Sequence, residues 1–308
     1  MQAKTIAPIY QVAYVIIPTI GTIGNFLIVF VTIRSKSLRS TCNILIALIS
    51  VSDIMQMFGL FVMMVTYYTI PTHIMPQADC ACWQLIPSCG MLLSTIWILN
   101  LAIDRLMSLQ RIYTMLVQNY TKEYIAMHIM PAVMISMGFG IWMFMERTEK
   151  VDILCEITAP MTGDIYLVIT KFVIVINVLI ILCYALFLYF MKKATSGTSN
   201  NDKMKNIYRS LIVTSLTVVL GWFTGTLIGI LGPVIEHHIP RADVDLFAGL
   251  FVNAPAVANI FIYYFISKDY RLVFQKHLFC WKKAGAVQVA PGGKVAPKST
   301  ATLSTAAK

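Results

Sequence analysis

A charged pair, Asp104 and Arg105, stands at the end of a long apolar stretch of the chain. A charge at the edge of a hydrocarbon layer is costly unless it is paired or faces something other than lipid. An aspartate beside an arginine supplies both members of such a pair. The stretch around these two residues therefore carries the strongest functional signal in the sequence.

Other polar side chains interrupt the apolar stretches of the chain. Such groups are costly inside a membrane and tend to be functional, although a single Asn or Ser can also join helices by hydrogen bonding. An unpaired carboxylate at Asp53 would be protonated, or would hold a cation or amide partners. Lys171 could either extend outward to the membrane surface or face the bundle and meet an anionic ligand group. The remaining polar positions are Asn25, Ser94, Asn100, Asn177, Asn253 and Asn259.

The composition indicates which elements must position these groups. Of the 308 residues, 58% are hydrophobic and only 12% are charged, whereas a soluble domain has about 25% charged residues. The formal net charge of +10 comes from basic residues spread through short loops. That distribution favours cytoplasmic loops and anionic lipid, and it argues against a nucleic-acid partner.

Seven apolar runs are each long enough for a membrane helix, which needs about 20 mostly apolar residues. The sequence therefore predicts an all-α membrane protein, a seven-transmembrane helix bundle over residues 10–266, after a short extracellular N-terminus at 1–9. The runs lie at about 10–33, 43–69, 84–110, 124–145, 165–191, 207–232 and 244–266.

After the seventh run, residues 267–281 place Tyr270, Phe274, Leu278 and Trp281 on one helical face, with basic residues on much of the rest. This pattern predicts a short amphipathic cytoplasmic helix on the inner leaflet. Small residues, lysines and hydroxyl residues dominate 282–308, which predicts a disordered cytoplasmic tail.

The basic residues also predict the orientation. Nineteen of them fall on the side that carries the loops after the first, third and fifth runs and the C-terminal segment, and four fall on the other side. Cytoplasmic loops carry the excess of Lys and Arg, so we expect the N-terminus outside and the C-terminus in the cytoplasm. We expect a multi-pass protein of the plasma membrane.

Three cysteines fall on the predicted outer side: Cys80, Cys82 and Cys155. The extracellular side permits disulfides. Either Cys80 or Cys82 could pair with Cys155 and draw the loop after the fourth run over the mouth of the bundle. A zinc site made from the same three cysteines is the alternative, but no clustered histidine supports it.

Taken together, residues 10–281 resemble the rhodopsin-like (class A) G-protein-coupled receptors. Gly24-Asn25 resembles the GN of helix one, and residues 48–53 resemble the Leu-x-x-x-Asp pattern of helix two, with one more residue between Leu48 and Asp53. Asp104-Arg105 resembles the Asp/Glu-Arg-Tyr motif, with Leu106 in place of tyrosine. Further matches are Tyr184 in helix five, Trp222 in helix six and Asn259-x-x-x-Tyr263 in helix seven, where Ile260 replaces the NPxxY proline.

The spacing within the resemblance assigns further residues. Cys80 lies 25 positions before Arg105, where the family has its disulfide cysteine, which implies a bond to Cys155. Ser94 lies 11 positions before Arg105, at a serine of the family's sodium pocket. The variant motifs and short loops are most similar to nematode chemoreceptor-type serpentine receptors, the Srsx group in particular.

The resemblance implies a receptor that binds an extracellular ligand, either a small chemosensory molecule or a short peptide, and activates a heterotrimeric G protein. At rest Arg105 would pair with Asp104. On activation it would turn toward Tyr184 and Tyr263 and open a cleft for the Gα C-terminal helix. Trp222 would couple the ligand to helix six. The implied switch comprises Asp104, Arg105, Tyr184, Trp222, Asn259 and Tyr263.

Two further sets of residues follow from the resemblance. No cofactor is expected except a sodium ion near Asp53, in a polar core with Asn25, Ser94 and Asn259. Pro87 stands where aminergic receptors carry aspartate, which disfavours an amine ligand, and Asn253 stands where an opsin carries its retinal lysine. The expected ligand-binding residues are Pro87, Met91, Lys171, Phe172, Trp222, Thr226 and Asn253.

Other classes of membrane protein would leave different patterns in the sequence. A small transporter or channel should carry internal repeats of span patterns, and none is evident. A membrane enzyme should carry a catalytic motif such as HExxH or a serine motif, and none is visible, so no enzyme is expected. A binding receptor that does not couple stays open, since Leu106 and Ile260 depart from coupling motifs. Besides the G protein, membrane lipids are expected partners, and phosphates on residues 299–305 could recruit arrestin.

Overall fold

The computed structural model describes residues 6–195, 212–213, 216–225, 227–228 and 241–277. Within that part of the chain, six helices are long and apolar enough to cross a membrane. They are α1 (Pro8–Arg34), α2 (Thr41–Thr69), α3 (Gln77–Met107), α5 (Thr121–Met145), α6 (Asp164–Thr195) and α8 (Arg241–Ile266). Each meets the length of about 20 residues that a membrane crossing requires.

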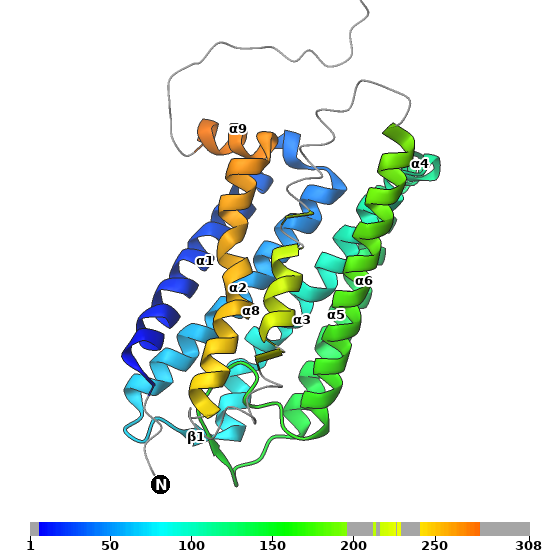
Figure 1. The fold of residues 1–308 in the computed structure, drawn as a ribbon. Helices are drawn as coiled ribbons and strands as arrows, with labels where there is room; N and C mark the ends of the chain where they lie inside the picture. The colour runs from blue at the N-terminus through cyan, green and yellow to red at the C-terminus, as the bar shows by residue number, and fades with distance from the viewer. Residues whose placement is uncertain (1–5, 196–211, 214–215, 226, 229–240, 278–308) are drawn as a thin grey trace, which may run out of the picture.

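The smaller elements lie at the two ends of these helices (Figure 1). A two-residue antiparallel pair joins β1 (Met75–Pro76) to β2 (Asp152–Ile153) at one end. The opposite end carries α4 (Arg111–Asn119), α9 (Lys268–His277) and the 3-10 turn η1 (Lys36–Leu38). Below, the end with β1 and β2 is called the disulfide end, and the end with α4 and α9 is called the Arg105 end.

The six predicted runs that fall in the described residues are all helices, and their bounds differ from the predicted ones by a few residues, with one larger difference. The third begins at Gln77 rather than near residue 84, so Cys80 and Cys82 lie within α3 and not before it. Hydropathy misses this first part because Gln77 and Gln84 are polar. Both side chains are nevertheless fully buried, and both donate hydrogen bonds to loop carbonyls.

Two other elements differ from the sequence expectation. The loop after α3 contains the helix α4, which the hydropathy pattern did not reveal because it is too short and too polar for a span. Of the predicted span 207–232, the helix Leu216–Gly225 and four neighbouring residues are described, and the rest lies outside the described residues. The tail at 282–308 also lies outside them.

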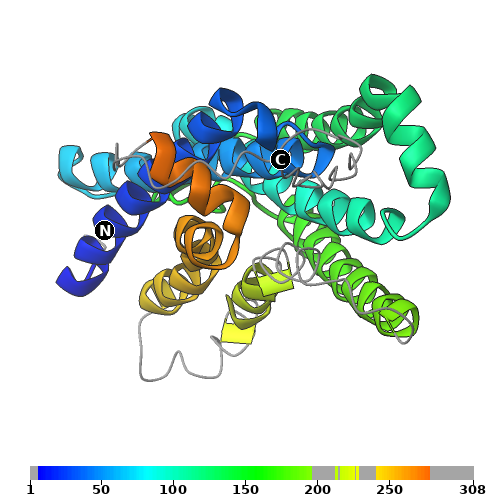
Figure 2. The ribbon, with the colours of Figure 1, turned by 90° about the horizontal axis from the view of Figure 1, so that it is seen from above.

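The helices pack around α3, the most deeply buried of the six candidate spans. It contacts α2, α5 and α6, while α1 packs between α2 and α8. Viewed along the bundle, α9 lies across the ends of the helices rather than in line with them (Figure 2). A single central helix thus carries residues of both ends of the molecule.

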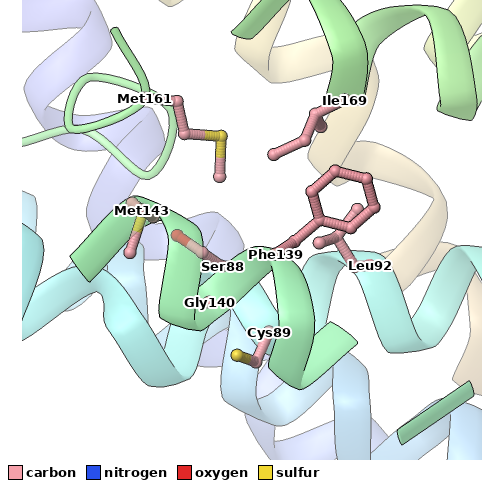
Figure 3. Close-up of a pocket in the computed structure, with 8 residues that line it drawn as sticks. All are labelled: Ser88, Cys89, Leu92, Phe139, Gly140, Met143, Met161 and Ile169. Carbon is pink, nitrogen blue, oxygen red and sulfur yellow. The ribbon is translucent and has the colours of Figure 1, made fainter. Parts of the chain in front are cut away.

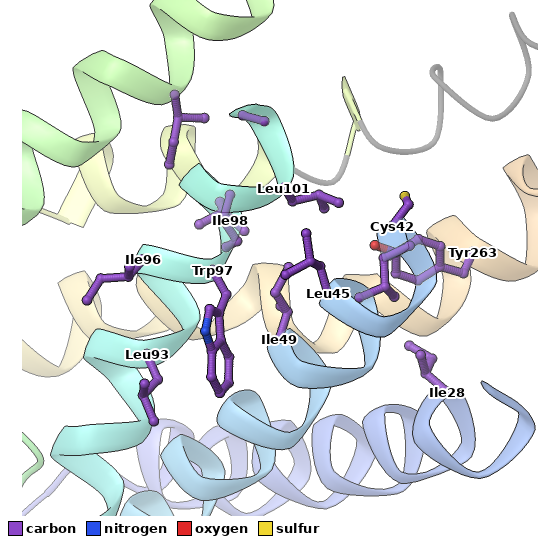
Figure 4. Close-up of a cluster of buried hydrophobic side chains, with 14 of the residues drawn as sticks. Ile28, Cys42, Leu45, Ile49, Leu93, Ile96, Trp97, Ile98, Leu101 and Tyr263 are labelled. Carbon is purple, nitrogen blue, oxygen red and sulfur yellow. The ribbon is translucent and has the colours of Figure 1, made fainter. Parts of the chain in front are cut away.

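The buried apolar side chains form two main clusters, one toward each end. The Arg105-end cluster is built from branched and aromatic side chains such as Ile49, Ile98, Leu101 and Tyr263 (Figure 4). The disulfide-end cluster is rich in methionine, which is flexible and fills irregular gaps. Its buried methionines are Met57, Met63, Met64, Met91, Met143 and Met161.

The amphipathic helix predicted after the last span is present as α9. Tyr270 and Phe274 are buried on one face, and the exposed Leu272 lies away from them. The Tyr270 hydroxyl lies 3.0 Å from Oγ1 of Thr32, which joins α9 to α1. Residues Leu278 and Trp281 of the predicted face lie outside the described residues.

Candidate functional site

Asp104 and Arg105 form the ion pair that their types predict. Nε of Arg105 donates to Oδ2 of Asp104 at 2.9 Å, and Nη2 also contacts that oxygen. Asp104 is fully buried and Arg105 is 8% exposed, at the Arg105 end of α3. Hydrogen bonds between ionised partners are among the stronger ones in proteins, so the pair holds the guanidinium close to its own helix.

Two tyrosines that the sequence reasoning missed complete the surroundings of Asp104. The hydroxyls of Tyr113 on α4 and Tyr124 on α5 donate to Oδ1 of Asp104 at 3.0 and 3.1 Å. Burial and the neighbouring carboxylate raise the pKa of Tyr113 above its ordinary value, so its hydroxyl keeps the proton that it donates. No motif spacing pointed to these tyrosines, because the turn into α4 decides where they lie.

The other predicted switch residues lie in or against the apolar clusters. Tyr184 of α6 and Tyr263 of α8 are both buried in the Arg105-end cluster. Trp222 is half-buried and packs against both this cluster and the disulfide-end cluster. Trp222 thus lies between the two clusters and contacts both.

The predicted polar core around Asp53 is largely present. Ser94 donates to Oδ1 of Asp53 at 2.6 Å, and Asn259 donates through Nδ2 to Oδ2 at 2.8 Å. Asn25 instead donates to the backbone carbonyls of Gly21 and Ala256, both at 2.9 Å. Asp53 thus accepts hydrogen bonds from two of the other three predicted residues, while Asn25 joins α1 to α8.

The loop of residues 146–163, here the α5–α6 loop, is fixed over the disulfide end. Cys80 and Cys155 form the predicted disulfide, and Cys82 is an exposed free thiol. The two bonded cysteines are thereby unavailable for the alternative zinc site. The described residues contain no group of three His, Cys, Asp or Glu side chains that could hold a metal ion.

Polar side chains of α3 hold the same loop by its carbonyl oxygens. Nε2 of Gln84 donates to Cys155 at 3.0 Å, and Oγ of Ser88 donates to Ile157 at 3.2 Å. Nε2 of Gln77 donates to Pro160 at 2.7 Å. The loop side chains Leu154, Ile157 and Met161 are consequently buried in the disulfide-end cluster.

The structure brings most of the predicted ligand-binding residues to this end. Pro87 and Met91 are buried in α3, and Phe172 packs against the disulfide-end cluster. Asn253 is buried and accepts a 2.9 Å hydrogen bond from Nε2 of Gln56. These side chains give an apolar region with one amide pair within it.

Lys171 and Thr226 complete the set of predicted ligand-binding residues. Lys171 is exposed on α6, which agrees with the outward one of its two predicted orientations, so it is not one of the buried residues. Thr226 lies outside the described residues.

A small pocket lies between α3, α5, α6 and the α5–α6 loop, with Met143 and Met161 at its side (Figure 3). Ser88, Leu92, Phe139 and Ile169 also line it, and its lining is almost entirely apolar. The pocket is too narrow to admit a water molecule. A ligand could enter there only if the flexible methionines moved aside.

Comparison with known proteins settles the class of this molecule. The family model described as serpentine type 7TM GPCR chemoreceptor Srsx matches residues 18–278. The chain belongs to the Srsx family of seven-transmembrane chemoreceptors. It is therefore a G-protein-coupled receptor with a seven-helix bundle, a membrane protein that binds an extracellular ligand. The helices α1, α2, α3, α5, α6 and α8 are six of these seven, and the short apolar helix Leu216–Gly225 is the described part of the remaining one, between α6 and α8.

Three named receptors are similar to this chain at low sequence identity. The somatostatin receptor type 5 of Bos taurus is 22% identical over 91% of this chain and 78% of its own length. The allatostatin-A receptor of Bombyx mori is 19% identical, over 90% of this chain and 81% of its own length. The somatostatin receptor type 5 of Rattus norvegicus is 20% identical, over 96% of this chain and 85% of its own length. This family and these relatives are receptors, a class distinct from enzymes.

Proposed function

We propose that the receptor activates a heterotrimeric G protein when an extracellular ligand shifts Arg105 away from Asp104. The supporting observation is the closed, buried ion pair at the Arg105 end of α3. A ligand shifts such an equilibrium only by binding the open state more tightly than the closed one. Tyr184 and Tyr263, buried near the same end, are the partners proposed for Arg105 in the open state.

Trp222 is the proposed connection between the ligand and this pair. It packs against both apolar clusters, so a change of packing at the disulfide end has a direct path to the Arg105 end. The disulfide-end cluster is rich in methionine and therefore repacks more readily than the branched cluster beyond it. Movement of the helix that carries Trp222 would open the cleft for the Gα C-terminal helix.

The ligand that we propose is a short peptide that inserts an apolar end, with a small chemosensory molecule as the second candidate. The named relatives are peptide receptors, and the predicted site is apolar around the Gln56–Asn253 amide pair. The amides would bind one polar group of the ligand. Buried Pro87 offers no charge to an amine.

A sodium ion is proposed beside Asp53 in the inactive receptor. A carboxylate and the Ser94 hydroxyl supply oxygen ligands, which suit a hard cation. Among the described residues, the buried Oδ1 of Asn259 has no hydrogen-bond partner, so this amide oxygen can serve as a further ligand. The ion would neutralise Asp53 and hold α2, α3 and α8 together.

The location proposed for the receptor follows from the distribution of charge. The disulfide end would face the outside, and the Arg105 end with α9 would face the cytoplasm and the inner leaflet of the plasma membrane. Lipid headgroups would then contact the basic residues of α9. Arrestin is a further proposed partner, through phosphates on residues 299–305.

The test uses full-length receptor in cells that carry a promiscuous Gα, screened against short peptides and odorants. Agonist-stimulated nucleotide exchange should be lost in Arg105→Ala at unchanged surface expression. Arg34→Ala, which removes an exposed arginine from the end of α1, is the matched control. Undiminished coupling in Arg105→Ala would refute the role of Arg105, and ligand binding without any exchange would identify a non-coupling receptor.

A further inference from the structure

Tyr113 is the side chain that touches both members of the charged pair. Its hydroxyl donates to Oδ1 of Asp104 at 3.0 Å and accepts from Nη2 of Arg105 at 3.4 Å. It stands on α4, outside the candidate membrane spans. Tyr124 donates to the same carboxylate oxygen from α5, and its hydrogen bond does not involve Arg105.

The two tyrosines therefore differ in what they lose when the pair opens. Tyr124 can keep its bond to Asp104 after Arg105 has turned away, so it contributes to both states. Tyr113 loses its contact with Arg105 in the open state, and it stabilises the closed state selectively. Only a difference between the two states moves the equilibrium.

The position of α4 makes this contact adjustable from the cytoplasmic side. Tyr113 is half-buried against the pair and its ring packs edge-to-face on Tyr124 at 5.9 Å. On the same short helix, Ile112 and Met115 are 61% and 64% exposed. A shift of α4 would carry the Tyr113 hydroxyl away from Asp104 and Arg105 together.

We propose that Tyr113 is a positioning residue that couples α4 to the Asp104–Arg105 pair and thereby sets the ligand-free activity of the receptor. The proposal rests on the proposed G-protein coupling through Arg105. Leu106, which follows Arg105, has no hydroxyl to replace the contact.

The experiment measures ligand-free nucleotide exchange by a panel of Gα proteins on full-length receptor in lipid vesicles. Tyr113→Phe removes one oxygen, and we expect about a threefold to tenfold rise in rate, which corresponds to the net contribution of one typical hydrogen bond. Tyr124→Phe should raise the rate less. Tyr120→Phe, which alters a tyrosine that is 58% exposed between α4 and α5, should match the wild type.

A second arm separates positioning from general stability. In a receptor that already carries Asp104→Ala, adding Tyr113→Phe should not raise the rate of ligand-free exchange further, because the Asp104–Arg105 pair is already broken. Asp104→Asn replaces Asp104→Ala if the alanine variant does not reach the membrane. A wild-type rate in Tyr113→Phe, or an equal rise with and without Asp104, overturns the inference. If Asp104→Ala raises exchange but Tyr113→Phe does not, the proposed function survives alone. If Asp104→Ala and Arg105→Ala both leave exchange unchanged with every Gα, both proposals fail.

Discussion

Nδ2 of Asn259 lies 2.8 Å from Oδ2 of Asp53, across 206 residues of sequence. Ser94 occupies the other carboxylate oxygen at 2.6 Å. One carboxylate thus joins α2, α3 and α8 halfway along the bundle. Within the described part of the chain, Oδ1 of Asn259 has no hydrogen-bond partner, so it is available to a sodium ion beside Asp53.

Asp53→Asn should abolish the effect of sodium on stability, because it keeps the hydrogen-bonding shape but removes the negative charge. In wild-type receptor, replacing choline chloride by sodium chloride should raise the unfolding temperature by about 2–4 °C, as expected for about 1 kcal/mol of ligand stabilisation. Thermal unfolding in detergent measures the sodium-dependent shift in the wild type and in Asp53→Asn. Asp164→Asn, at an exposed carboxylate, should keep the wild-type shift, and a full shift in Asp53→Asn would refute the site.

Gly59→Ala should loosen the α5–α6 loop. A Cβ at Gly59 would lie 2.6 Å from Oε1 of Gln84 and 2.6 Å from Cγ1 of Ile157. Overpacking of this kind costs about 1–3 kcal/mol. We expect a lower unfolding temperature and faster proteolysis within the loop. Gly138→Ala is the control, because its Cβ would meet nothing within 4 Å, and unchanged loop proteolysis in Gly59→Ala would contradict the packing.

Cys80→Ser should destabilise the receptor by about 2–4 kcal/mol, since removal of the disulfide restores freedom to the unfolded chain and to the loop. Cys155→Ser should have the same effect, and the double variant should be no worse than either single one. Cys82→Ser changes a free, exposed thiol and should leave thermal unfolding unaltered. If Cys82→Ser proved as damaging as Cys80→Ser, the assigned pairing would be wrong.

Tyr270→Phe should weaken the attachment of α9 to α1. Thr32 Oγ1 already donates to the Ile28 carbonyl, so the Tyr270 hydroxyl is the donor in their 3.0 Å contact. A double-mutant cycle with Thr32→Val should give a coupling of about 0.5–1.5 kcal/mol in thermal unfolding. Tyr189→Phe, at an exposed tyrosine of α6, is the control, and a coupling near zero would count against the contact.

Tyr270 should also make the stability of the folded receptor depend on pH in the alkaline range. Burial raises the pKa of Tyr270 above its ordinary value of 10.0, so the folded state favours the neutral hydroxyl. Its contribution to stability is complete below about pH 10 and declines as the pH rises above that value. Unfolding between pH 9 and pH 11 should therefore lose less stability in Tyr270→Phe than in the wild type, and equal losses would exclude this titration.

Hydropathy and motif spacing located most of the site. The length of an apolar run depends only on local composition, so hydropathy predicted the six described spans with approximate bounds. Asp104 and Arg105 are adjacent in the chain, so their pairing needed no knowledge of the fold. The resemblance to rhodopsin-like receptors, applied through the spacing from Arg105, implied Cys80 rather than Cys82 as the bonded cysteine and assigned Ser94 to the polar core of Asp53.

Tertiary structure decided the contacts that join separate elements. Asn25 bonds the carbonyl of Ala256 rather than Asp53, and Lys171 points outward, because the rotation of each helix about its axis is fixed by its neighbours. Gln84 reaches Cys155 only where the disulfide has drawn the loop inward. Tyr113 and Tyr124 meet at Asp104 only because α4 folds back beside α5, a turn that no local pattern in the sequence specifies.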